Sequence, residues 1–291
     1  MSRRLRLDRH LSVISRVGRG GGGAVFIVWN HRAWCPMACK VIDSARRARR
    51  EADVLNALDH PNIVRFFGQG HSAHLLMEYL DGPTLRRLIR TSPQRRLSVA
   101  NALRLAIHVG AALTHVHERG FIHLDVKPSN VIVVGGRPVL FDFSAARRRT
   151  DRPLGQAAGT DPYMAPEQCR GGQVTPASDV FGLGVTLYES LTGRYPFPDG
   201  TRRKPFPQLS VSAASLRPFA PAVPASLERL VLACLAPNPA ARPAMAVLLP
   251  KLHEFIRTGP RMWPETVEPA HRRERVRTAG RPGTRAHRRA A

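Results

Sequence analysis

The stretch FIHLDVKPSN, residues 121–130, concentrates three chemically different polar groups in one short segment. The carboxylate of Asp125, the ammonium of Lys127 and the amide of Asn130 follow a long apolar region. Such groups are costly to fix together unless they face a charged ligand. The stretch therefore predicts a loop that binds a charged group, and the apolar Leu124 directly before the aspartate needs an explanation.

The chain of 291 residues carries a formal net charge of +24, and 43% of its residues are hydrophobic. This is enough apolar material for one large domain or for two lobes with cores of their own. A strongly basic chain is attracted to nucleic acid, acidic lipid surfaces, acidic proteins or nucleotide phosphates. The same charge also follows if arginine and alanine are simply favoured residues in this chain, so both interpretations stay open.

The four cysteines form no CxxC pair and no Cys/His cluster of the kind that binds zinc. They are typical of unpaired thiols in a reducing cytosol, so we expect a cytoplasmic protein. The basic N-terminal stretch has no apolar run behind it and does not predict a signal peptide. We also expect no membrane span, since no stretch approaches the roughly 18 to 20 apolar residues that one needs.

Composition divides the chain into a basic N-terminal extension and three further zones, with boundaries at 1–9, 10–80, 81–256 and 257–291. The zone after the extension contains β-branched, alternating runs typical of strands and one pattern typical of a helix. The strands are expected at 24–30, 37–43 and 75–80, and the helix at 44–58.

The next zone is mostly helical in its pattern. The segment 98–120 predicts a helix with Ser98 as its N-cap and Gly120 at its end. The segment 178–193 predicts a second helix of the same design that stops at Gly193.

A glycine-rich run begins at Gly18, and Gly18, Gly20 and Gly23 satisfy the pattern G-x-G-x-x-G. Glycines allow a backbone to approach phosphates closely and to donate N–H groups to them. The pattern alone is weak, because such a run is often a flexible linker. A dinucleotide-binding fold needs a helix after the loop, whereas AVFIVWN, residues 24–30, predicts a strand. The loop is therefore expected to join two strands, like the glycine flap over the ATP phosphates of a protein kinase.

With this loop and the stretch HLDVKPSN, residues 123–130, the chain resembles the eukaryotic-type (Hanks-type) serine/threonine protein kinases, including their bacterial members. The resemblance covers residues 10–256. It implies an α+β, bilobal protein-kinase-like fold, with a small antiparallel β-rich N-lobe that contains one helix and a larger, mainly α-helical C-lobe. It also implies transfer of the γ-phosphoryl group of ATP, with Mg²⁺ or Mn²⁺, to Ser or Thr hydroxyls of a protein substrate.

The resemblance implies a role for each polar residue of the opening stretch. Asp125 would accept or orient the proton of the substrate hydroxyl, Lys127 would neutralise charge on the transferring phosphoryl group, and Asn130 would hold a metal ion. Asp142, in VLFDFS, matches the aspartate that binds the metal bridging the phosphates. A lysine two residues after the catalytic aspartate is typical of the serine/threonine-specific form of the loop.

Lys40, in MACK, matches the strand lysine that binds the α- and β-phosphates, and Glu51 is the candidate for its ion-pair partner on the following helix. Only eleven residues separate the two, which is shorter than expected for the family. The alternative is that Glu51 forms a surface i,i+4 pair with Arg47. Glu51 is, however, the only glutamate between Lys40 and Glu78, which favours it as the partner.

The stretch LLMEYLDG, residues 75–82, matches the hinge between the lobes. The resemblance implies that Met77 is the gatekeeper and that backbone groups of Glu78 and Leu80 bond the edge of adenine. Four further side chains would hold the adenine ring by apolar contact: Val17, Val25, Ala38 and Ile132.

The activation segment ends in GTDPYMAPE, residues 159–167, in which Thr160 is expected near the catalytic loop. The resemblance implies two structural roles outside the chemistry. Asp179 would hold the backbone of the catalytic loop, and Arg242 would form a buried ion pair with Glu167.

The sequence departs from the family pattern at two positions. Leu124 stands where an arginine normally precedes the catalytic aspartate, and Ser144 replaces the glycine of D-F-G. Neither change removes a group that touches ATP, metal or the hydroxyl, so both bear on regulation more than on chemistry. Because leucine has no charge, Leu124 cannot pair with a phosphate on the activation segment. The remaining candidate phosphosite on this segment is Thr150, which follows three arginines. We therefore expect activity that does not depend on phosphorylation of this segment.

Two other functions remain open. The chain could be a pseudokinase-type module that binds nucleotide or a partner without turnover, although every chemical position is filled. Alternatively, residues 257–291, which contain ten arginines, three glutamates and four prolines, could be the main functional element. Their composition is typical of a disordered tail, and such a tail would contact nucleic acid or another acidic surface.

Overall fold

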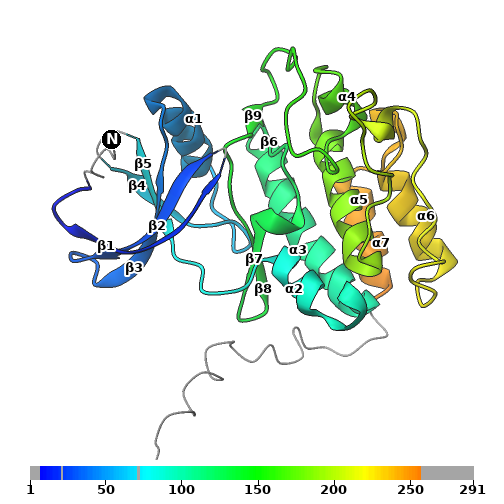
Figure 1. The fold of residues 1–291 in the computed structure, drawn as a ribbon, viewed down its shortest axis with the longest axis horizontal. Coiled ribbons are helices and arrows are strands. Elements are labelled where there is room, and N and C mark those ends of the chain that lie inside the picture. The colour runs from blue at the N-terminus through cyan, green and yellow to red at the C-terminus, as the bar shows by residue number, and fades with distance from the viewer. Residues whose placement is uncertain (1–6, 21, 71–72, 257–291) are drawn as a thin grey trace, which may run out of the picture.

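The computed structural model describes residues 7–20, 22–70 and 73–256, which form two parts (Figure 1). The first part is an antiparallel sheet with one helix beside it, and the second part is mainly helical. The chain passes from the first to the second directly after strand β5 (His74–Glu78). The expected bilobal α+β fold is confirmed.

The sheet of the first lobe has five strands in the order β1-β2-β3-β5-β4, each antiparallel to its neighbours. The other four strands are β1 (Leu11–Gly20), β2 (Gly23–Asn30), β3 (Cys35–Val41) and β4 (Phe66–Gln69). Gly20 pairs with Gly23 at the end of the β1–β2 hairpin, so the glycine run joins two strands. Gly23 has φ +136°, and a Cβ there would lie 2.3 Å from the carbonyl oxygen of Val41, so only glycine fits.

Helix α1 (Ala45–Asn56) packs against β4 and β5, within the range expected from the sequence. Ser44 caps the helix by accepting the N–H of Arg47 at 3.4 Å. Apolar residues such as Ala48 and Leu55 are buried on the inner face, and Glu51 is buried with them. Because a buried carboxylate is costly without a partner, the position of Glu51 indicates a cation opposite it.

The second lobe is organised around helices α3 (Val99–Glu118) and α5 (Pro176–Thr192), which pack against each other. The other helices are α2 (Leu85–Thr91), α4 (Pro166–Cys169), α6 (Ala225–Cys234) and α7 (Met245–Glu254). Two short antiparallel strand pairs lie on the side that faces the first lobe (Figure 1), namely β6 (Phe121–Ile122) with β9 (Arg147–Arg148) and β7 (Val131–Val134) with β8 (Arg137–Leu140). The 3₁₀ turns span Pro93–Arg95, Pro128–Asn130, Pro207–Leu209 and Pro239–Ala241.

The two central helices begin and end close to where their sequences predict. Ser98 caps α3 by accepting the N–H of Asn101 at 3.3 Å, and Gly120, with φ +80°, follows its last turn. Gly193 ends α5 in the left-handed region, with φ +71°. The apolar patterns of both helices are explained by burial, since both contribute to the main core of the protein.

Among the described residues, one helix, α3, is long and apolar enough to cross a membrane by length and composition alone. From the sequence we expect this helix at 98–120, but not that it is long and apolar enough for a span. However, 56% of its apolar window is buried inside the protein, where it packs against α5 and α7. A Cβ at Gly110 would come within 2.4 Å of Leu249 Cδ2, so α3 and α7 are in close contact. The apolar surface of α3 is therefore used in the core of the second lobe.

A buried ion pair connects α4 to the segment before α7. Arg242 Nη1 and Nη2 donate to Glu167 Oε1 and Oε2 at 2.7 and 2.8 Å, and Ser178 Oγ donates to Oε1 at 2.7 Å. Burial raises the pKa of Glu167, but the guanidinium of Arg242 outweighs this effect, and the pKa is lowered overall. The glutamate is therefore ionised at neutral pH and the pair is a true charge pair.

We expect Glu167→Gln to lower the free energy of unfolding by about 3 to 5 kcal/mol, because it leaves the guanidinium of Arg242 buried without its counter-charge. Denaturant unfolding followed by circular dichroism measures this loss. The matched control is Glu254→Gln at the exposed end of α7, which should change the free energy of unfolding by less than about 0.5 kcal/mol. A loss below about 1 kcal/mol in Glu167→Gln would contradict the importance given to the pair.

Candidate active site

One buried carboxylate holds the backbone of the loop at 123–130. Asp179, in the first turn of α5, is 1% exposed and accepts the N–H groups of His123 at 2.9 Å and Leu124 at 2.8 Å. His117 Nε2 lies 2.7 Å from the same carboxylate. Burial raises the pKa of Asp179, but the hydrogen bond and charge of His117 outweigh it, so the pKa is lowered. Leu124 has φ +66°, a costly conformation for a residue with a Cβ, and these bonds hold it there.

The polar groups of the loop converge on Asp125. Its Oδ2 accepts from Lys127 Nζ at 2.6 Å and from Asn130 Nδ2 at 2.9 Å, while its Oδ1 accepts from the hydroxyl of Thr160 at 2.6 Å. Lys127 Nζ also donates to the Thr160 oxygen. A hydroxyl group thus lies between a carboxylate that can accept its proton and an ammonium that can compensate negative charge, which is what general base chemistry on a hydroxyl requires.

Asn130 and Asp142 offer oxygen atoms to a divalent cation. The amide nitrogen of Asn130 donates to the backbone and side-chain oxygens of Asp125, both at 2.9 Å, so its Oδ1 remains available for a metal. Asp142 follows β8 with φ +64°, and its Oδ1 accepts from Lys40 at 2.7 Å. Within the described ranges, no group of three or more His, Cys, Asp or Glu could hold a metal by itself. The two oxygen donors of Asn130 and Asp142 are compatible with a hard divalent cation that takes its other ligands from water or phosphate.

The ammonium of Lys40 is shared by two carboxylates from different parts of the chain. Its Nζ lies 2.6 Å from Glu51 Oε1 on α1 and 2.7 Å from Asp142 Oδ1. Burial lowers the pKa of Lys40, but Asp142 and Glu51 outweigh this and raise it overall. Burial raises the pKa of Asp142, yet Lys40 brings it down to about 2. For Glu51 burial outweighs the effect of Lys40, and the pKa of this carboxyl is raised.

Lys40, Glu51 and Asp142 line a cleft of ≈ 650 Å³ between the two lobes, together with the three partners of Asp125, which are Lys127, Asn130 and Thr160. This volume suits a nucleotide-sized ligand. A Cβ at Gly22 would lie 2.9 Å from Lys40 Nζ, so the glycine hairpin passes directly over the ammonium. The carbonyl of Leu80 accepts from Gly82 at 3.1 Å, which leaves the N–H of Leu80 as the group that can face an adenine edge. Other expected residues on the cleft walls are Val17, Gly18, Gly23, Val25, Ala38, Met77, Glu78 and Ile132.

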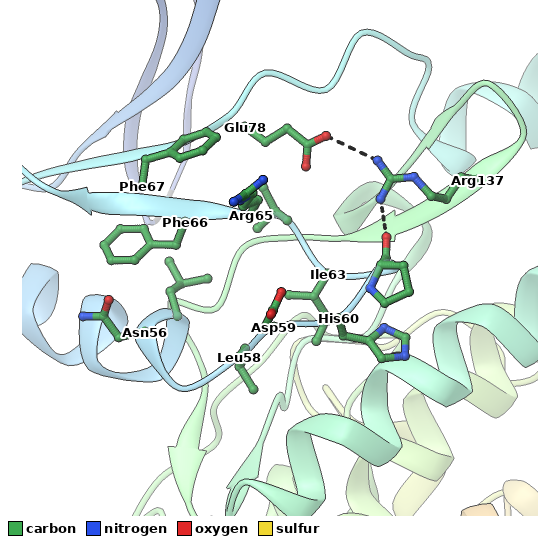
Figure 2. Close-up of a pocket in the computed structure, with 13 residues that line it drawn as sticks. Asn56, Leu58, Asp59, His60, Ile63, Arg65, Phe66, Phe67, Glu78 and Arg137 are labelled. Carbon is green, nitrogen blue, oxygen red and sulfur yellow. Dashed lines mark hydrogen bonds and ion pairs between the residues drawn. The ribbon is translucent and has the colours of Figure 1, made fainter. Parts of the chain in front are cut away.

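A second hollow, of ≈ 640 Å³, shares only Val64 and Glu78 with this cleft. Figure 2 shows that its lining comes from the end of α1, the connection to β4, and the β7–β8 hairpin. Arg137 on the hairpin pairs with Glu78 at 3.3 Å and donates to the carbonyl of Pro61. The pair is partly exposed and adds little stability. The hollow contains none of the groups that converge on Asp125, so we assign the chemistry to the first cleft.

Leu124 is buried in a small apolar cluster. It packs with Ile122 and Val174, and the partly buried Leu154 lies against them. The carbonyl of Leu124 accepts from Gln168 Nε2 at 2.9 Å. Since Leu154 belongs to the segment that follows Asp142, apolar packing and the hydrogen bonds of the Gln168 side chain hold this segment beside Leu124.

Two further positions singled out in the sequence, Ser144 and Thr150, are exposed. The N–H of Ser144 donates to Asp142 Oδ1 at 3.4 Å, so the serine is compatible with the turn that carries Asp142.

Sequence reasoning missed several residues that the fold brings to the site. His117 and Gln168 position the loop at 123–130, as described above. Arg86 on α2 donates to Ser129 and Tyr163, both at 2.7 Å. These contacts join segments far apart in the chain, and no local pattern marks them. Other lining residues that were not anticipated are Gly22, Val64, Tyr79, Thr84 and Phe141.

Comparison with known proteins gives a consistent result. Residues 11–255 match the protein kinase domain family. The chain is 30% identical over 251 residues to serine/threonine-protein kinase PrkC of Bacillus subtilis (strain 168), covering 80% of this chain and 38% of that protein. It is 32% identical over 267 residues to serine/threonine-protein kinase PknA of Mycobacterium tuberculosis (strain ATCC 25618 / H37Rv), covering 83% of this chain and 58% of that protein.

A third relative, serine/threonine-protein kinase PkaA of Streptomyces coelicolor, is 38% identical over 212 residues, covering 69% of this chain and 38% of the relative. The matches to these three proteins thus span between 38% and 58% of their lengths.

Proposed function

Since this chain belongs to the protein kinase family, we propose that it is an active serine/threonine protein kinase that transfers the γ-phosphoryl group of ATP to Ser or Thr hydroxyls of a protein. The observation that carries the proposal is the convergence of Lys127, Asn130 and the Thr160 hydroxyl on the carboxylate of Asp125. Phosphoryl transfer requires positioning and charge compensation more than covalent chemistry by the protein, and this loop supplies both.

Each group of cleft residues has a separate role in the proposed reaction. Lys40, held by Glu51, would bind the α- and β-phosphates, while the glycine hairpin covers them and the hinge backbone receives adenine. Asp142 and Asn130 would hold Mg²⁺ or Mn²⁺, which neutralises the phosphate charge that develops during transfer. Asp125 would orient the attacking hydroxyl and accept its proton, and Lys127 would stabilise the transferring group.

The alternative of a pseudokinase is not favoured. A module that only binds nucleotide has no need of Asp125, Lys127 and Asn130 in mutual hydrogen-bond contact. The two departures from the family pattern, Leu124 and Ser144, leave these contacts in place. The unpaired state of all four cysteines also supports a reducing, cytoplasmic setting for the domain.

We expect Asp142→Ala to lower turnover by about a thousandfold or more, or ~4 kcal/mol in the barrier, because Asp142 organises the metal on the reacting phosphates. The adenine contacts lie elsewhere in the cleft, so the affinity for ATP should fall by only about tenfold, or ~1.4 kcal/mol. Steady-state kinetics at saturating Mg·ATP and calorimetric titration with ATP separate the two effects. Lys40→Met should likewise lose most of the activity.

The matched control for this prediction is Asp199→Ala, which removes an exposed carboxylate from the loop after α5. It should keep turnover within about twofold of the wild type. If Asp142→Ala retained near wild-type turnover at saturating Mg·ATP, the metal assignment would be wrong.

We further propose that catalysis does not depend on phosphorylation of the activation segment. Thr150→Ala, prepared free of phosphate, should keep turnover within roughly threefold of the wild type, which is under ~0.7 kcal/mol in the barrier. The reason is that Leu124 is fixed by apolar packing and has no charge that a phosphate could neutralise. A loss of about a hundredfold, or ~2.7 kcal/mol, that Thr150→Glu restores would contradict this proposal.

The attraction of residues 257–291 to polyanions stays a prediction, and these residues lie outside the described ranges. A chain that ends at residue 256 should melt at the same temperature as the full chain, because the tail has few apolar groups to repay ordering. Its binding to DNA and to anionic liposomes should be weaker and less salt-dependent. Unchanged binding would reject the polyanion contact, and a large drop in melting temperature would reject the view that the tail is dispensable for folding.

A further inference from the structure

One carboxylate in the segment after β9 connects this segment to both lobes. Asp151 Oδ2 accepts from Arg50 Nη2 at 2.8 Å, from Arg147 Nε at 3.4 Å and from the backbone N–H of Arg148 at 3.2 Å. The side chain of Asp151 is 27% exposed and that of Arg147 is 21% exposed, so both are partly shielded from water. A single oxygen atom thus receives three donors, of which two come from arginine side chains.

The donors lie on elements whose relative position is important for catalysis. Arg50 lies on α1 directly before Glu51, which pairs with Lys40. Arg147 lies on β9, which pairs with β6 directly before the catalytic loop. The carboxylate of Asp151 therefore connects the helix that holds Lys40 to the segment that enters the catalytic loop.

An anion surrounded by arginines is the arrangement that orders a kinase activation segment when the anion is a phosphate. Here the anion belongs to the chain itself, at the position next to the exposed Thr150. Two of the neighbouring cations are already engaged, since Arg147 donates to Asp151 and the guanidinium of Arg148 lies over the ring of Phe121 at 5.0 Å. A phosphate added nearby would find these partners in use.

We propose that Asp151 is a positioning residue that takes the place of an activating phosphate. It holds α1, and hence Glu51, in the position that catalysis needs. The proposal rests on the kinase function proposed above and describes how the kinase activity is regulated. It also explains how the segment is held when Leu124 offers no cation beside the catalytic aspartate. The apolar cluster around Leu124 fixes one part of the segment, and the carboxylate of Asp151 fixes the part that faces α1.

The effect should be moderate, because Arg50 is 56% exposed and exposed ion pairs are individually weak. A contact of this strength matters when the catalytically competent position of α1 is only slightly more stable than a displaced one. We expect Asp151→Asn and Arg50→Gln, free of phosphate, each to lower kcat by about fivefold, or ~1 kcal/mol. The double variant should lose no more than Asp151→Asn alone, because Asp151→Asn already removes the contact with Arg50.

Three comparisons distinguish positioning from a general loss of stability. Arg49→Gln removes an exposed charge from the same turn of α1 and should leave kcat within about 1.5-fold of the wild type. Asp151→Glu keeps the charge and should restore kcat to within about twofold of the wild type. All rates are measured well below the melting temperature of each variant, with KM for ATP determined separately, since the account predicts that kcat falls more than the affinity for ATP.

Hydrogen exchange along α1 provides a readout that does not need turnover. Asp151→Asn should exchange faster than the wild type within residues 45–56, and Arg49→Gln should not. Unchanged exchange together with unchanged kcat in Asp151→Asn would overturn the proposal, as would additive losses in the double variant. If the wild type itself transferred no phosphate, the kinase function would fail, while the exchange experiment would still decide whether Asp151 holds α1.

Discussion

The structure depends on a single buried ammonium that two carboxylates share. Lys40 on β3 contacts Glu51 on α1 and Asp142 after β8, so the sheet, its helix and the second lobe meet at one cation. Lys40 and Glu51 lose their water on burial and Asp142 loses part of it, and that cost is offset only if the geometry of all three groups is kept. The arrangement of the two lobes around the cleft therefore depends on these three charges. An ammonium in this position can bind the phosphates of ATP.

The second constraint is a strained backbone held from two sides. Leu124 has φ +66°, and its N–H is bound by Asp179 while its carbonyl is bound by Gln168. With the backbone fixed in this way, the side chain is free to pack, and it joins an apolar cluster under the following segment. An arginine at this position would instead bring a charge that needs a partner. On the proposals made above, the apolar residue replaces a switchable contact by a permanent one, and the ion pairs of Asp151 have the same character.

Much of the site could be predicted because its residues lie close together in the sequence. The loop 123–130 contains three of the candidate site residues, and the glycine run is recognisable by the strand that follows it. The short spacing between Lys40 and Glu51 left their pairing open, since only the packing of α1 on the sheet decides which way the glutamate faces. Contacts such as Arg50 with Asp151, 101 residues apart, could not be predicted, because no local pattern marks either partner. Likewise, the sequence of α3 does not indicate which elements cover its apolar surface, because α5 and α7 lie far from it in the chain.

The most direct test of the account is transfer of the labelled γ-phosphoryl group of ATP. The full chain is incubated with Mg²⁺ and a generic basic protein substrate, beside Asp125→Asn, which keeps the size of the side chain but cannot accept a proton. We expect label on Ser or Thr of the substrate with the wild type, and a loss of about a hundredfold or more with the variant. Equal labelling in the two samples would contradict the assignment of Asp125, and with it the view that the cleft is a catalytic site.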